Sequence, residues 1–290
     1  MLEAHQPRTT PKPVPNRFTW IARALQSTFA GHVSRATLLK RLLPLSFATH
    51  FGALGLAAMS FPTSFDWRVR VISELTDPED NPRGYWLASV GVMAAMLVLL
   101  PFAGYLTQRL QAIEPRLARF SGTTFALAFG LTAISMVTQL AQPVIGLRWL
   151  HALLAGAGAG CFIVGMFCCT TGALHERRHR SAGLRTLSSA LVWSWLSLTL
   201  LPVICLAVIG ALMFLGHQAG LAWAENFRQS FRHTLLWNLA FWEWIGIGMG
   251  YGFMAISVLL LPTAGEAGKV PPGNPEAGRP GEAISHFRRD

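Results

Sequence analysis

The run Trp86–Thr107, WLASVGVMAAMLVLLPFAGYLT, contains no charged residue and decides the fold of this chain. At a rise of about 1.5 Å per residue, roughly 20 apolar residues in a helix cross a hydrocarbon core of about 30 Å. Hydrocarbon offers no partner for backbone N–H and C=O groups, so such a segment must pair them internally. The run therefore predicts a transmembrane helix.

Five more apolar runs of at least similar length flank it, at Leu43–Phe61, Gly122–Ala141, Trp149–Leu174, Leu187–Leu215 and Leu235–Leu261. None alternates apolar and polar residues as a membrane strand does. Only 13% of the 290 residues are charged, against about 25% in soluble domains. We therefore predict an all-α integral membrane protein, with a six-transmembrane-helix bundle at residues 43–261.

The two ends of the chain differ from these runs. Residues 1–42 are polar and rich in proline at first, and Phe18–Val33 then has apolar residues at helical spacing. This pattern predicts a cytoplasmic tail with a short amphipathic N-terminal helix, which lies on the membrane or packs on the bundle's own loops. Residues 262–290, rich in Gly and Pro, predict a disordered cytoplasmic tail. The first apolar run begins too late and is too long for a signal peptide.

Basic residues alternate between the connecting segments. Of the 24 Lys and Arg, 18 lie in the two tails and in the second and fourth connections. The remaining six are Arg68, Arg70, Arg83, Arg148, Arg228 and Arg232. By the positive-inside rule, both termini face the cytoplasm, and the predicted location is the cytoplasmic (inner) membrane. Tryptophans agree, since several fall at the opposite, outer helix ends: Trp67, Trp86, Trp149, Trp223 and Trp237.

The net charge of +10 does not indicate a nucleic-acid partner, because the basic residues sit between apolar runs rather than on one soluble face. The predicted partner is membrane lipid. A homo-oligomer or a larger membrane complex is the alternative, and no cofactor is predicted.

The first outer loop, Asp66–Arg83, carries five of the 14 acidic residues and two turn signals, Asp77-Pro78 and Asn81-Pro82. It is either a cap folded back on the bundle or a solvated connector. If it is a cap, Glu74 and Arg83 are its candidate ligand-binding residues.

Glu243 lies about eight residues into the last run, roughly 12 Å below the outer surface. A carboxylate at that depth is costly and normally faces a cavity or a partner. It could carry a proton, anchor a ligand head group, or make a structural hydrogen bond. His151 and Gln139 are predicted on the same outer side and could join Glu243, whereas His50 is predicted nearer the inner side and away from both.

His175-Glu176-Arg177-Arg178-His179 matches H-E-x-x-H, a zinc-binding spacing on a helix. The neighbouring arginines would repel a cation and no obvious third ligand follows, so a metallohydrolase is a minor alternative. The four cysteines all lie in apolar runs and are predicted to be packing residues.

Small residues recur at G-x-x-x-G spacing in the pairs Gly156–Gly160, Gly246–Gly250 and Gly248–Gly252. They predict close helix contacts within the bundle or a dimer face.

The chain resembles the bacterial multi-pass membrane family called domain of unknown function 998, which is distantly similar to the Frag/DRAM/Sfk group. The resemblance covers about Leu43–Leu261 and rests on Ile72-Ser73-Glu74-Leu75 with Pro82-Arg83, on His151, and on Glu243 within Trp242–Gly248. It implies six helices and, by analogy with the eukaryotic group, a lipid-related role.

These observations support binding of a lipid or other amphipathic ligand in an outward-facing polar pocket formed by Glu243, His151, Glu74, Arg83 and Gln139. A proton-coupled transporter and an accessory subunit of a larger complex remain alternatives.

Overall fold

The computed structural model describes residues 32–111, 113–146, 148–179, 187–217, 220–231, 234–235 and 238–262. Regular secondary structure in these residues is entirely helical, and six helices are long and apolar enough to cross a membrane. The prediction of six such helices is confirmed. The predicted tail after residue 262, and all but the last two residues of the predicted helix Phe18–Val33, lie outside the described residues.

Five of the six long helices lie close to their predicted runs. They are α5 (Tyr85–Leu110), α6 (Pro115–Ile145), α7 (Arg148–His179), α8 (Ser189–His217) and α10 (Leu239–Leu260). The last helix begins four residues after the start of its predicted apolar run. Asn238 caps it there, because its side chain accepts the N–H of Ala240 at 3.0 Å.

The first long helix begins earlier than predicted. It is built from α2 (Arg35–Thr37), the π-helix η1 (Leu38–Leu42) and α3 (Leu43–Met59). Pro44 explains the wide turn, since it has no N–H and its ring would meet the carbonyl of Lys40 in a regular helix. The N–H of Leu43 bonds instead to the carbonyl of Leu38, five residues earlier. Lys40 and Arg41 therefore lie inside the first long helix rather than in a tail before it.

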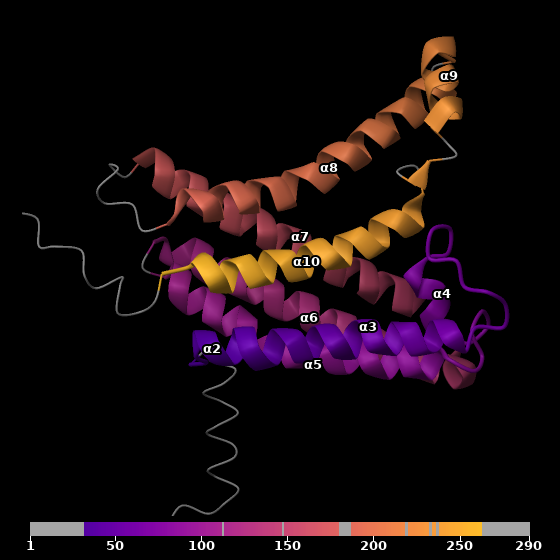
Figure 1. The fold of residues 1–290 in the computed structure, drawn as a ribbon, viewed down its shortest axis with the longest axis horizontal. Coiled ribbons are helices and arrows are strands. Elements are labelled where there is room, and N and C mark those ends of the chain that lie inside the picture. Colours follow the sequence, from indigo (N-terminus) through magenta and orange to yellow (C-terminus); the bar gives the residue numbers. More distant parts are fainter. Residues whose placement is uncertain are drawn as a thin grey trace, which may run out of the picture.

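The helices α3, α5, α6 and α7 pack side by side in that order, and α8 and α10 complete the bundle (Figure 1). Aromatic rings from five helices meet at its centre. Phe125 of α6 lies 5.7 Å from Phe102 of α5, 5.1 Å from Phe162 of α7 and 5.9 Å from Phe253 of α10, measured between ring centroids. Trp195 of α8 stacks on Phe253 at 5.1 Å.

Close helix contacts occur mostly at glycines outside the predicted G-x-x-x-G pairs. A Cβ on Gly91 would collide with Ala53, and a Cβ on Gly122 would collide with Thr107. Of the predicted glycines, only Gly250 has a neighbour, Phe162, and a Cβ on any of the others would meet nothing within 4 Å. Contact within the bundle is therefore wrong for those others, and on α7 it is Gly158 that meets α6, at Thr132. The dimer face stays a prediction.

Two short helices lie where the sequence predicts only connecting segments. The first connection contains α4 (Ile72–Thr76), and α9 (Ala222–Phe231) lies between α8 and α10. Trp223 and Phe227, one turn apart on α9, are both exposed.

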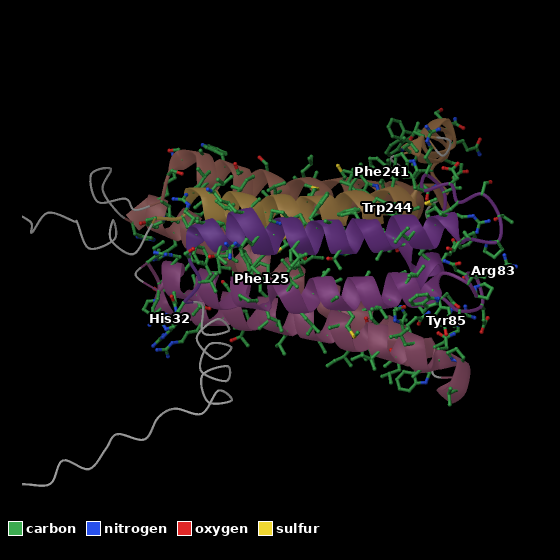
Figure 2. All side chains as sticks on the ribbon, turned by 60° about the horizontal axis from the view of Figure 1, so that its bottom comes forward. His32, Arg83, Tyr85, Phe125, Phe241 and Trp244 are labelled. Carbon is green, nitrogen blue, oxygen red and sulfur yellow. The ribbon has the colours of Figure 1, made fainter. Side chains whose placement is uncertain are left out.

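The bundle has two chemically different ends, marked in Figure 2 by His32 at one end and by Arg83 and Tyr85 at the other. The α4 end carries five acidic residues of the first connection: Asp66, Glu74, Asp77, Glu79 and Asp80. The opposite end, called the basic end below, carries mainly cations: Arg35, Lys40, Arg41, Arg109, Arg116, Arg119, Arg177 and Arg178.

Candidate functional site

The segment 60–84, which joins α3 to α5, is folded onto the α4 end. Asn81 is completely buried at its centre. Its side-chain amide donates to the carbonyls of Ala57 at 3.1 Å and Leu75 at 3.2 Å, and its Oδ1 accepts the N–H of Gly84 at 3.1 Å. These bonds join the end of α3, the end of α4 and the start of α5. Of the two predictions for this loop, the folded cap is therefore confirmed.

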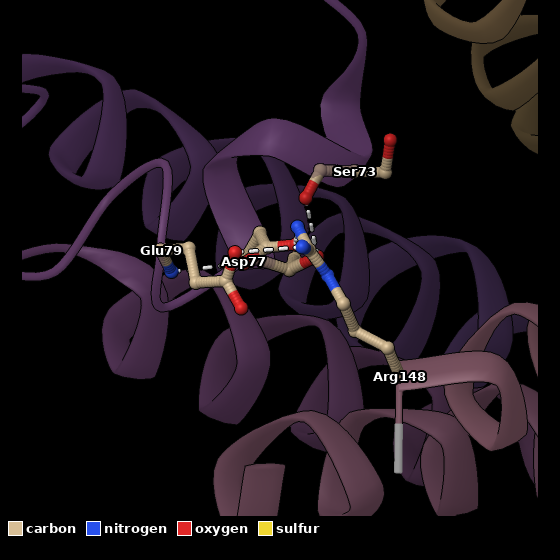
Figure 3. Close-up of polar contacts among 5 residues, drawn as sticks. Ser73, Asp77, Glu79 and Arg148 are labelled. Atoms are coloured by element: carbon tan, nitrogen blue, oxygen red, sulfur yellow. Dashed lines mark hydrogen bonds and ion pairs between the residues drawn. The ribbon is translucent and has the colours of Figure 1, made fainter. Parts of the chain in front are cut away.

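Arg148, the first residue of α7, ties the same segment to the far side of the bundle (Figure 3). Its guanidinium donates to Asp77 at 2.5 Å and to Glu79 at 2.7 Å. The segment still has an excess of negative charge. Burial raises the pKa of Asp80, and the carboxylates of Asp77, Glu74 and Glu79 raise it further, while Arg148 lowers it.

Glu243 ties the segment to α10. Its Oε2 accepts the backbone N–H of Ile72, the first residue of α4, at 2.7 Å. Glu74 of α4 pairs with Arg70, which precedes the helix, at 2.7 Å, and the Arg70 guanidinium lies 4.8 Å from the ring centroid of Phe61. Of the three roles predicted for Glu243, the structural hydrogen bond is therefore present in the structure. Its donor is the backbone N–H of Ile72 in the cap.

Trp244 begins a column of aromatic rings between α10 and the first helix. Its ring centroid lies 6.5 Å from Phe65 and 6.3 Å from Phe51, and Phe51 lies 6.1 Å from Tyr251 further along α10. The indole nitrogen is buried, and no described residue accepts its N–H. A buried donor without an acceptor costs about 1–3 kcal/mol. The residue next to Glu243 thus holds an unused hydrogen-bond donor.

A chain of buried hydrogen bonds lies at the end of this aromatic column that contains Tyr251. Ser46 donates its hydroxyl hydrogen to the carbonyl of Ala95 at 3.0 Å. Because a hydroxyl has one hydrogen, Ser46 accepts from Tyr251 at 2.8 Å, and Tyr251 in turn accepts from Nδ1–H of His50 at 3.3 Å. His50 is only 4% exposed. Its partner Tyr251 lies eight residues along α10 from Glu243, about 12 Å at helical rise.

His151 and Gln139 lie on a different side of the α4 end. His151 bonds through Nδ1 to the carbonyl of Ser135 at 3.0 Å, which joins α7 to α6. Gln139 is 2% exposed, and its Oε1 has no partner among the described residues. The first turns of α7 and of α10 lie on opposite sides of the α3–α5 pair in both views (Figures 1 and 2). The structure therefore does not bring His151 or Gln139 to Glu243.

The predicted five-residue pocket thus divides into two groups. Glu74 and Glu243 form one group with α4, and Gln139 and His151 form the other beside Arg148 at the α6–α7 corner. Arg83 joins neither, since it is exposed and forms no ion pair with a described residue.

In the H-E-x-x-H motif, the two histidines lie on one face of the helix as the spacing predicts, but the glutamate does not lie on that face. The rings of His175 and His179 lie 4.3 Å apart on an exposed face of α7. Glu176 is buried, and it accepts the N–H of Leu187 at 3.2 Å. No group of three His, Cys, Asp or Glu in the described ranges is placed to hold a metal ion. The four cysteines are free.

Sequence reasoning missed Arg148, Asn81 and Tyr251 as organising residues. Arg148 had a usable signal, because it is one of six basic residues on the predicted outer side and directly precedes an apolar run. Asn81 was recognised only as part of a turn. Tyr251 is a phenol within an apolar run, which indicates a buried hydrogen-bond partner without saying which one.

Comparison with protein-family models, with curated proteins and with solved structures finds no match to this chain, so the resemblance to domain of unknown function 998 stays a prediction.

Proposed function

We propose that this chain is a multi-pass membrane protein that binds an amphiphile, with a membrane lipid as the first candidate. The polar head of the ligand would lie beside Glu243 and Trp244, under the cap formed by residues 60–84. Its apolar tail would follow the seam between α3 and α10, where Phe47 is 48% exposed and its ring packs against that of Tyr251 at 5.3 Å.

The indole N–H of Trp244, which has no acceptor among the described residues, supports this proposal. Polar groups at membrane depth are costly, and those that persist there are usually paired or face a cavity or ligand. In Glu243, Oε2 accepts the N–H of Ile72, and Oε1 takes no part in that hydrogen bond. A head group that offers an acceptor to Trp244 and a donor to Glu243 would complete both residues.

The orientation belongs to the same proposal. Cations gather at the basic end, so the positive-inside rule favours that end in the cytoplasm and the α4 end outside, in an inner membrane. A C-terminal fusion to an enzyme that is active only in the cytoplasm should then be active. Activity only from a reporter that requires export would reverse the orientation.

Ligand retention tests the site. The full chain is purified in mild detergent, and the molecules that remain bound are measured by mass spectrometry. Trp244→Phe keeps the ring but removes the unpaired donor, and Glu243→Gln removes the charge while keeping an acceptor for Ile72. Loss of one hydrogen bond of about 1.4 kcal/mol predicts roughly tenfold lower retention in each variant.

Two variants on α9 serve as matched controls, Trp223→Phe and Glu225→Gln, since α9 lies outside the proposed site. Both should retain the ligand as wild type does. Equal retention by wild type and Trp244→Phe, with cooperative thermal unfolding in both, would exclude this site.

A further inference from the structure

Two buried hydrogen-bond donors without acceptors lie at the basic end. The side chain of Tyr105 on α5 is 1% exposed, and its hydroxyl has no partner among the described residues. One helical turn further, the Nη1 of Arg109 is also buried without a partner there. The two side chains are in contact, with the Arg109 guanidinium 5.1 Å from the Tyr105 ring centroid.

The chemistry of these two groups indicates which kind of hydrogen-bond acceptor would bind them. A guanidinium has only donors, and a phenol can donate its one hydrogen. Leaving a buried charged donor without an acceptor is more costly than leaving a neutral one. An anion with several oxygens could accept from both side chains at once, as phosphate does from arginine.

The surroundings favour an anion as well. Two acidic residues are described near this end, Glu114 and Glu176, and each accepts a backbone N–H, that of Arg116 and that of Leu187. Neither accepts from the Tyr105 hydroxyl or from Arg109 Nη1. The π-helix η1 packs against α5 and carries the exposed cations Lys40 and Arg41. Single π-turns are frequent at functional sites.

We infer that Tyr105 and Arg109 form a binding site for a phosphate group at the basic end of the bundle. The phosphate can come from the head group of an anionic lipid or from inorganic phosphate in solution. In either case the Tyr105 hydroxyl and Arg109 Nη1 donate to its oxygens, and the cations of η1 raise its local concentration. The site is separate from the amphiphile site at the α4 end, so either can fail without the other.

Two probes distinguish the sources. Native mass spectrometry of the full chain in detergent measures binding of added phosphatidylglycerol against phosphatidylcholine. Thermal unfolding measures stabilisation by inorganic phosphate against chloride at equal ionic strength. The variants are Tyr105→Phe and Arg109→Gln. The controls are Tyr85→Phe and Arg83→Gln, the same residue types at the α4 end.

We expect Arg109→Gln to weaken binding of the effective probe by roughly tenfold or more, and Tyr105→Phe by several-fold, as lost charge-assisted hydrogen bonds predict. The controls should bind as wild type does. A variant-dependent preference for phosphatidylglycerol identifies the lipid, and variant-dependent stabilisation by phosphate alone identifies the soluble anion. If both variants bind both probes like wild type, or if the controls lose as much, the site does not exist.

Discussion

The two ends of the bundle differ in how their polar groups are paired, although the α4 end also has buried polar atoms without a partner among the described residues, such as the indole nitrogen of Trp244. At the α4 end, Asn81, Arg148 and Glu243 each bond to a part of the chain distant in sequence, so that one loop joins α3, α5, α7 and α10. At the basic end, Tyr105 and Arg109 are buried without acceptors among the described residues. The comparison indicates that contacts within the chain hold the α4 end together, whereas the described residues at the basic end supply no acceptor for Tyr105 and Arg109.

The largest effect should come from Asn81→Ala. The substitution removes three buried side-chain hydrogen bonds, to the carbonyls of Ala57 and Leu75 and from the N–H of Gly84. Ala57 and Gly84 keep backbone partners, the N–H of Ser60 and the carbonyl of residue 81. We therefore expect a loss of about 2–4 kcal/mol in the free energy of unfolding. Thermal or denaturant unfolding in detergent measures it. Asn238→Ala, which removes only the cap of α10, should cost about 1 kcal/mol. Equal losses in the two variants would show that Asn81 is not the centre of the α4 end.

Two tyrosines should respond with opposite signs. Tyr251→Phe breaks the bonds to Ser46 and His50 and should lower the free energy of unfolding by about 1–2 kcal/mol. Tyr105→Phe removes a hydroxyl that has no partner and should raise the free energy of unfolding by about 1 kcal/mol in lipid-free, phosphate-free detergent. Unfolding curves of both variants under the same conditions decide this. A loss in Tyr105→Phe would mean that its hydroxyl is satisfied within the protein.

The smallest effect should come from the ion pair between Arg148 and Asp77. The Arg148 side chain is 52% exposed, so solvent screens the pair, and we expect a coupling of about 1 kcal/mol. A double-mutant cycle with Arg148→Met and Asp77→Asn measures it. Hydrogen exchange in residues 60–84 should rise in both single variants, and Arg83→Met should leave it unchanged. A coupling near zero would mean that Asn81 and Glu243 alone hold the cap.

The number of helices long and apolar enough to cross a membrane was predictable, because crossing imposes a length and a composition on each segment separately. The same local logic recognised Asp66–Arg83 as a distinctive segment and Glu243 as a residue needing a partner. The prediction was wrong at the start of the first long helix. Lys40 and Arg41 indicated the end of a segment, but a π-turn accommodates Pro44, and the helix is continuous through Lys40 and Arg41. Of the glycines at G-x-x-x-G spacing, only Gly250 meets another helix of the bundle, since spacing does not say which face of a helix meets a neighbour.

The sequence by itself determined six apolar helices and the uneven distribution of charge between their connections. The predicted depth of Glu243 was too large, because α10 begins at Leu239 and Glu243 is its fifth residue. Only the tertiary structure decided that Glu243 bonds to Ile72 while His151 bonds to Ser135, which separates two residues that the sequence placed on one side of the membrane. It also decided which donors stay without partners. The physical reason is that depth along a helix follows from counting residues, whereas position around the bundle depends on the order and rotation of the packed helices.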